Sequence, residues 1–134
     1  MTALPRFVLC VDDDEDDRLI VSETIGEVDP HIEVVHATNG LEAIHYLSKA
    51  KIDPALFPCL VILDINMPLM DGKQTLATIK KDEELKHLPI VLFSTSNSPM
   101  DKLFCEVHGV ELITKPSNLL GIKKEVSRLL QHCA

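Results

Sequence analysis

Five short apolar runs constrain the fold of this sequence more than any other feature. Most of them are apolar at every position and are bounded by turn residues. That pattern is typical of strands covered on both faces of a parallel sheet, whereas alternating strands would have favoured a sandwich. The runs are residues 7–11, 32–35, 60–63, 90–93 and 110–113.

Segments with helical signals lie between and after these runs. Asn39, with Glu42 three residues later, resembles a capping box that begins a helix through Lys49. Ser98 and Pro99 pair a capping residue with a proline at the first helical position. The other helices are expected after Asp14, over 71–81 and from Ser117 onward. The result is five repeats of strand then helix, which right-handed crossovers assemble into an α/β doubly wound parallel sheet with helices on both faces.

Length and charge limit the number of domains and the classes of partner. A chain of 134 residues that is 46% apolar can bury one core, and we expect a single domain over residues 1–134 with no output domain. The formal net charge of −8 opposes both the phosphate backbone of nucleic acids and anionic membrane surfaces. Direct nucleic-acid or membrane binding is therefore not expected.

The four cysteines, Cys10, Cys59, Cys105 and Cys133, are widely separated. None forms the close pair that zinc sites or thiol redox motifs require. The first six residues hold no apolar stretch long enough for a signal peptide. The sequence therefore predicts reduced thiols in a cytoplasmic protein.

Polar residues with complementary chemistry follow four of the apolar runs. Doubly wound sheets place their functional site beyond the carboxyl ends of the strands, where the strand order reverses. If the first and third strands are neighbours, three acids converge there, and two carboxylates about 5 Å apart repel by roughly 3 kcal/mol at an effective dielectric of 20. Such a cluster needs a cation, and hard oxygen ligands favour Mg²⁺, with Mn²⁺ as a substitute. The residues that follow the runs are Asp12, Asp13 and Asp14, then Asp64, then Ser94 and Thr95, then Lys115 and Pro116.

The acidic stretch after the first run has two alternative interpretations. Glu15, Asp16 and Asp17 are expected to form the solvated first turn of a helix, where acidic side chains are stabilising. A calcium-binding loop that begins at Asp12 would need glycine at its sixth position, where this chain has Asp17. A calcium hand is therefore disfavoured.

Four segments of the chain resemble the receiver domain of bacterial two-component response regulators. They are FVLCVDDDEDDR (7–18), LDINMPLMDG (63–72), Ser94–Ser96 and the Lys115–Pro116 pair. The resemblance extends over nearly the whole chain, and the ordered set of motifs at these spacings is specific. It implies a flavodoxin-like fold of five strands in the order 2-1-3-4-5.

Carried over position by position, the resemblance makes Asp64 the phosphoacceptor and Asp12 and Asp13 the acidic pair that organises the metal. The backbone carbonyl of Asn66 would be a further metal ligand. Lys115 would pair with the acceptor or phosphoryl oxygens, and Ser94 would be the hydroxyl that moves toward the phosphoryl group. The family's Lys-Pro turn also implies a cis bond between Lys115 and Pro116 that aims the lysine inward.

The resemblance further implies that the chain is a phosphoryl-accepting switch and not an enzyme that turns over a separate substrate. Such a switch catalyses only its own phosphorylation and dephosphorylation. The phosphoryl donor would be a sensor histidine kinase or a histidine phosphotransfer protein. The long loop at 52–58 and the stretch 79–96 are similar to small single-domain regulators that accompany phytochrome-type sensor kinases. Output would come through partner contact, with a homodimer among the options, or through onward phosphotransfer.

One departure from the family pattern concerns how the switch is read. An aromatic residue usually lies three positions before the lysine, where this chain has Leu112, and the stretch 109–115 is one residue shorter than usual. Readout through a rotating aromatic is therefore not expected here. Phe93 or Phe104 would take over part of that packing.

Three other functions fit parts of the pattern. A haloacid-dehalogenase-type phosphohydrolase also forms a phosphoaspartate, but it needs a second acid where this chain has Asn66, which cannot transfer a proton. A flavodoxin-like nucleotide binder would need a glycine-rich phosphate loop after a strand, which is absent. A receiver that serves only as a scaffold would not need the intact acidic set.

Overall fold

Five parallel strands form one sheet in the order β2-β1-β3-β4-β5 in the computed structural model, which describes residues 5–134. The fold prediction is therefore confirmed, down to the strand order. Each strand coincides with a predicted apolar run to within two residues at either end. The strands are β1 (Arg6–Val11), β2 (Ile32–Ala37), β3 (Pro58–Leu63), β4 (Ile90–Ser94) and β5 (Glu111–Thr114).

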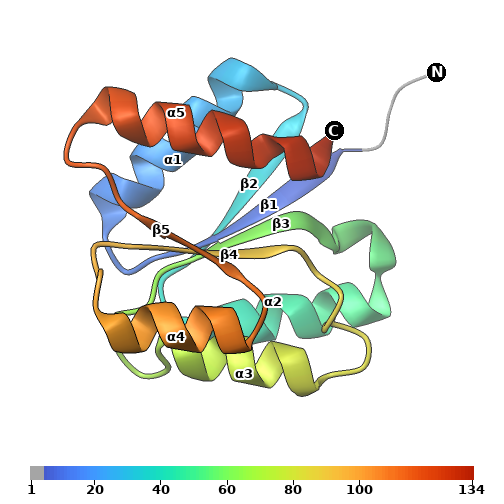
Figure 1. Cartoon of the computed structure of the whole chain (residues 1–134). Coiled ribbons are helices and arrows are strands. Elements are labelled where there is room, and N and C mark those ends of the chain that lie inside the picture. The colour runs from blue at the N-terminus through green and yellow to red at the C-terminus, as the bar shows by residue number, and fades with distance from the viewer. Residues whose placement is uncertain (1–4) are drawn as a thin grey trace.

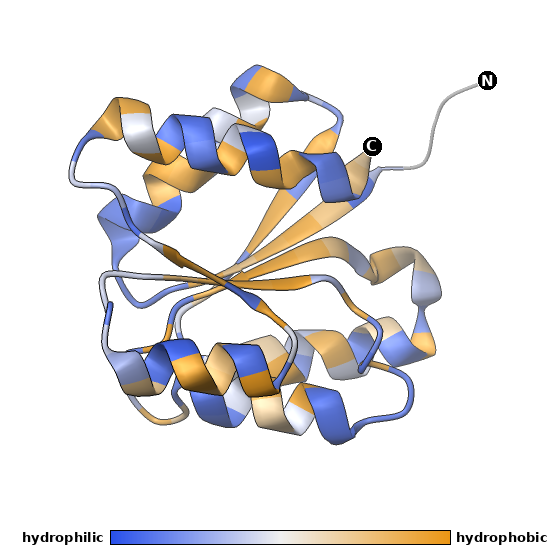
Figure 2. Cartoon of the chain, viewed as in Figure 1, coloured by the Kyte–Doolittle hydropathy of each residue, from blue (hydrophilic) through white to orange (hydrophobic). Residues whose placement is uncertain are grey.

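Helices cover both faces of the sheet (Figure 1). Helices α1 (Glu15–Val28) and α5 (Leu119–Leu129) lie on one face, and α2 (Gly40–Ile52), α3 (Gly72–Lys81) and α4 (Pro99–Val107) lie on the other. Successive strand residues point to opposite faces, so each strand contributes to two separate apolar cores. Figure 2 shows the central strands in the hydrophobic colours, whereas the helices carry both hydrophobic and hydrophilic residues.

Capping residues determine where the helices begin. Asn39 and Ser98 cap α2 and α4 through the backbone N–H groups of Glu42 and Asp101, as their positions in the sequence predicted. The capping box of α2 is incomplete, however, because the Glu42 carboxylate accepts a hydrogen bond from the backbone N–H of Thr38 and not from that of Asn39. Helix α5 is capped by Asn118 and not by Ser117, so it begins later than predicted.

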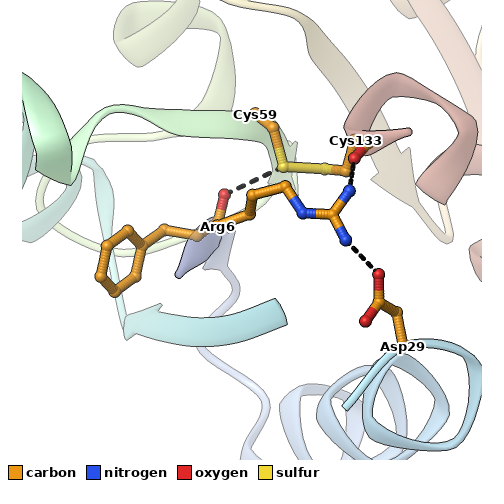
Figure 3. The surroundings of a disulfide bond; sticks show 5 residues. Arg6, Asp29, Cys59 and Cys133 are labelled. Atoms are coloured by element: carbon orange, nitrogen blue, oxygen red, sulfur yellow. Dashed lines mark hydrogen bonds and ion pairs between the residues drawn. A yellow bond between two sulfur atoms is a disulfide. The ribbon is translucent and has the colours of Figure 1, made fainter. Parts of the chain in front are cut away.

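The prediction of four reduced thiols is wrong for one pair, because Cys59 and Cys133 form a disulfide (Figure 3). Cys59 lies near the start of β3, and Cys133 ends a 3-10 turn (Leu130–Cys133) that follows α5. The Arg6 guanidinium donates to the backbone oxygen of Cys133 and to the carboxylate of Asp29 (Figure 3). The sheet folds so that these distant cysteines meet at its amino edge, whereas Cys10 and Cys105 are free and buried.

Within residues 5–134, none of the helices is both long and apolar enough to cross a membrane.

Candidate functional site

Backbone hydrogen bonds continue the parallel ladder one residue past β1 and β3. The N–H of Asp12 donates to the carbonyl of Ala37 at 3.0 Å, and the N–H of Asp64 donates to the carbonyl of Val11 at 2.9 Å. Asp12 and Asp64 are therefore fixed side by side at the carboxyl edge of two central strands. This is the edge at which sheets of this kind place their sites.

Three acids gather at that edge. Asp12, Asp13 and Asp64 each offer one carboxylate oxygen, and these oxygens all lie within 4.8 Å of one another. Asp12 and Asp64 are buried, with 5% and 8% of their surface exposed, whereas Asp13 is exposed. The cluster is thus closed on the protein side and open to solvent at Asp13.

Lys115 is the cation nearest to this cluster. Its Nζ donates to Asp12 Oδ2 at 2.6 Å and to Asp17 Oδ2 at 2.8 Å, and it lies 3.6 Å from Asp64 Oδ2. Burial raises the pKa of Asp12 to about 6 against the opposing pull of Lys115. Burial alone would lower the pKa of Lys115, but hydrogen bonds from its ammonium to Asp12 and Asp17 outweigh burial and hold it above the usual value. The hydrogen bond between the two groups therefore favours the charged form of each, against the effect of burial.

Asp17 is the residue of this site that sequence reasoning missed. We expected a solvated first-turn acid, but its carboxylate accepts from Lys115, and its side chain is only 26% exposed. The N-cap residue Asp14 orients the first turn of α1 by accepting from the N–H groups of Asp16 and Asp17. No local signal could have found the contact, because Lys115 lies 98 residues away in sequence.

The expected cis bond between Lys115 and Pro116 is absent, since no peptide bond among residues 5–134 is cis. The lysine points inward for another reason. Its backbone N–H donates to the carbonyl of Ser94 at 2.8 Å, continuing the β4–β5 ladder, and its ammonium is held by Asp12 and Asp17. The sheet register and the carboxylates together position the side chain.

Ser94 ends β4 beside Lys115 and is fully buried. Its hydroxyl oxygen lies 3.4 Å from the backbone N–H of Ser96, which is a long hydrogen bond. Asn66 lies two residues beyond Asp64 in the loop before α3 and is exposed.

Gly72 holds the acceptor loop close to the sheet. Its backbone N–H donates to the carbonyl of Ile65 at 2.8 Å, and a Cβ at this position would collide with the backbone carbonyl of Asp64. The backbone N–H of Ile65 in turn donates to Asp64 Oδ1 at 2.7 Å. One carboxylate oxygen of Asp64 is thereby engaged, and the other faces Lys115.

Leu112 occupies the position where an aromatic was expected. It is half-buried in the core beneath α4, and Phe104 packs in the same cluster. Phe93 belongs to the core on the opposite face of the sheet, so it cannot replace an aromatic at position 112. Its ring centroid lies 5.9 Å from the Lys115 ammonium.

Residues 8–127 match the family model of the response regulator receiver domain. The chain belongs to this family. Receiver domains are parts of two-component signalling systems, and the family is not in general one of enzymes that turn over a separate substrate.

Individual relatives are similar over almost the whole chain. The response regulator Rcp1 of Synechocystis sp. is 32% identical over 91% of this chain and 84% of its own length. The crystal structure of its Mn²⁺-bound form superposes with a TM-score of 0.84 at 29% identity, covering 95% of this chain and 93% of that one. The phosphorylated cyanobacterial phytochrome response regulator RcpA gives a TM-score of 0.86 at 32% identity, covering 95% and 92%.

Other relatives are much longer. A probable cyclic di-GMP phosphodiesterase of Vibrio cholerae is 29% identical over 93% of this chain, but the chain covers only 26% of that protein. Similarity to such proteins concerns their receiver portion and says nothing of their other activities.

Proposed function

We propose that this receiver accepts a phosphoryl group on Asp64 in the presence of a divalent cation held by Asp12, Asp13 and Asp64. The observation that carries the proposal is the meeting of three carboxylates and one buried lysine at the carboxyl edge of β1 and β3. The family membership and the phosphorylated RcpA structure support it. The Mn²⁺-bound Rcp1 structure supports the cation.

The carboxylate geometry fits a small hard cation. Oxygens around Mg²⁺ at about 2.1 Å are separated by about 3 to 4 Å, and one oxygen from each acid already lies within 4.8 Å of the others. We assign Asp12, Asp13 and Asp64 as its carboxylate ligands, with the carbonyl of Asn66 as a fourth protein ligand. When bound, Mg²⁺ or Mn²⁺ neutralises charge on the transferred phosphoryl group.

Asp64 is the nucleophile in this proposal. An oxygen of its carboxylate forms a bond to phosphorus while the bond from phosphorus to the donor nitrogen breaks and the donor imidazole keeps that electron pair. Oδ1 accepts a hydrogen bond from Ile65, so Oδ2 is the freer atom for attack. The Lys115 ammonium, 3.6 Å from Oδ2, balances the negative charge that arrives with the phosphoryl group.

Ser94 is the residue we assign to sensing the phosphoryl group. Its hydroxyl is a hydrogen-bond donor that is held only by a long contact to Ser96, so it is able to turn toward new acceptor oxygens. The backbone carbonyl of Ser94 accepts a hydrogen bond from the backbone N–H of Lys115. Movement at Ser94 is therefore coupled to the end of β5.

We infer a histidine-phosphate donor, either a sensor histidine kinase or a phosphotransfer protein, because that is the donor class of the family. We also propose that residues 1–134 form a single receiver domain and that the protein is cytoplasmic. The output partner would read the phosphorylated state by contact or accept the phosphoryl group in turn.

The test is phosphorylation by a small donor, followed by intact mass. With Mg²⁺ and acetyl phosphate, the wild type is expected to gain one phosphoryl group, and Asp64→Asn is expected to gain none. Asp71→Asn is the matched control, because Asp71 caps α3 seven residues later and asparagine caps equally well.

Uptake by Asp64→Asn, or no uptake by wild type, would refute the assignment. Steady release of phosphate from many phosphomonoesters would instead support a hydrolase.

A further inference from the structure

Asp101, in the first turn of α4, is a buried acid that takes no part in the site above. Only 8% of its surface is exposed. Oδ2 accepts a hydrogen bond from the Ser96 hydroxyl, and Oδ1 lies 2.5 Å from the Lys73 ammonium of α3. The carboxylate therefore joins three segments: the loop after β4, the start of α4 and the start of α3.

Both oxygens of Asp101 serve this junction. The ion pair with Lys73 and the hydrogen bond from Ser96 hold the pKa of Asp101 below its usual value, against the effect of burial. Lys73 also lies 5.5 Å from the centroid of the Phe104 ring, on the inner side of α4. An acid held in this way has to lose favourable contacts before α4 or the loop can shift.

The loop that Asp101 holds begins at the proposed phosphoryl sensor. Ser94 ends β4, and Ser96 follows two residues later with its N–H directed at the Ser94 hydroxyl. A displacement of Ser94 is therefore transmitted to Ser96 through a very short length of chain.

We propose that Asp101 is a positioning residue that holds the Ser94–Ser98 loop as it stands in the unphosphorylated chain, and that the Ser96–Asp101 contact opens when Ser94 moves toward a phosphoryl group on Asp64. This inference rests on the proposed function, since it concerns how that site is read. The contact stabilises one of two states, so its removal shifts the population toward the phosphorylated arrangement.

The test measures binding of a phosphoryl mimic, beryllofluoride with Mg²⁺, by fluorine NMR of the bound form. Asp101→Ala and Ser96→Ala should each lower the half-saturating beryllofluoride concentration by at least about fivefold, the lower end of the usual range of allosteric couplings. The double variant should gain little more than either single variant, because both remove the same contact.

Glu27→Ala is the matched control. It also removes one carboxylate from an ion pair between helices, with Lys123, but on the opposite face of the sheet. It should leave the half-saturating concentration unchanged. Ser96→Ala changes no charge, so agreement between Ser96→Ala and Asp101→Ala separates the contact from simple electrostatics.

Hydrogen exchange gives the second measurement, on protein without the mimic. Amides of residues 95–104 should exchange faster in Asp101→Ala than in wild type, and in wild type they should exchange faster once beryllofluoride is bound.

The outcomes separate the two proposals. If wild type binds no beryllofluoride, the proposed function fails and this inference fails with it. If wild type binds it but both variants bind equally well or more weakly, or if the exchange rates do not differ, Asp101 has only a structural role and the inference is overturned.

Discussion

The disulfide between Cys59 and Cys133 should contribute a large share of the stability of this chain. It closes a loop that spans 74 residues of sequence. In the chain-entropy model, a loop of that length reduces the entropy of the unfolded chain enough to stabilise the fold by about 4.4 kcal/mol at 25 °C. Measured values are often lower, so we expect a loss of about 2–4 kcal/mol in the free energy of unfolding when the bond is reduced.

Urea unfolding followed by circular dichroism, with and without a phosphine reductant, measures this loss. For a urea dependence of about 2 kcal/mol per molar, the midpoint should fall by about 1–2 M on reduction. Cys59→Ser, Cys133→Ser and the double variant should all unfold near the midpoint of the reduced wild type, and the reductant should have no effect on them.

A thiol count under denaturing conditions provides the independent check. Burial raises the pKa of Cys10 to about 12, so its thiol reacts only after unfolding. The oxidised wild type should show two thiols, Cys10 and Cys105, and the reduced protein should show four. Four thiols before reduction, or an unchanged urea midpoint after it, would refute the reasoning.

Three further predictions concern the site and the Asp101 contact. Lys115→Met should lower the free energy of unfolding in magnesium-free buffer by roughly 3 kcal/mol, because Asp12 is left buried and uncompensated, and Mg²⁺ should restore part of the loss; no response to Mg²⁺ in urea melts would contradict it. Gly72→Ala should cost about 1–3 kcal/mol, because its Cβ meets the backbone of Asp64, and it should also slow phosphorylation by acetyl phosphate; wild-type stability and rate would count against it. Because the pKa of Asp101 is lowered in the folded chain, its ionised carboxylate stabilises the fold, and this contribution is complete at pH values above the pKa that Asp101 has in the unfolded chain. The difference in free energy of unfolding between wild type and Asp101→Asn should therefore be constant down to about pH 4 and shrink below it; a difference that grows in acid would have the wrong sign.

The sequence was sufficient to predict features set by local pattern. The three central strands β1, β3 and β4 are short apolar runs because they are largely buried on both faces, and Asp12 and Asp64 directly follow two of these runs. Parallel strands end at one edge of the sheet, so the meeting of these two acids followed from the strand order. The caps at Asn39 and Ser98 were equally local, since a cap and the N–H that it accepts lie three residues apart.

Contacts between distant side chains were not predictable in the same way. Cys59 and Cys133 lie 74 residues apart with no spacing motif, and only the docking of the last helix brings them together. Asp17 was expected to be solvated because acids are generally favoured at a helix N-terminus, and that preference takes no account of a lysine that follows β5. The bond before Pro116 was expected from family analogy to be cis, but the lysine is positioned by the sheet register.

Lys115 also links the chemistry of the chain to the completion of its folding. It reaches Asp12 across 103 residues of sequence, and the last strand has to dock before that contact can form. Until then, Asp12 and Asp64 lack their internal counter-charge, and loop-closure entropy makes so distant a contact slow to form. We therefore expect the ion pair to form late in folding, so that a chain that has not completed its sheet lacks the lysine beside the acids.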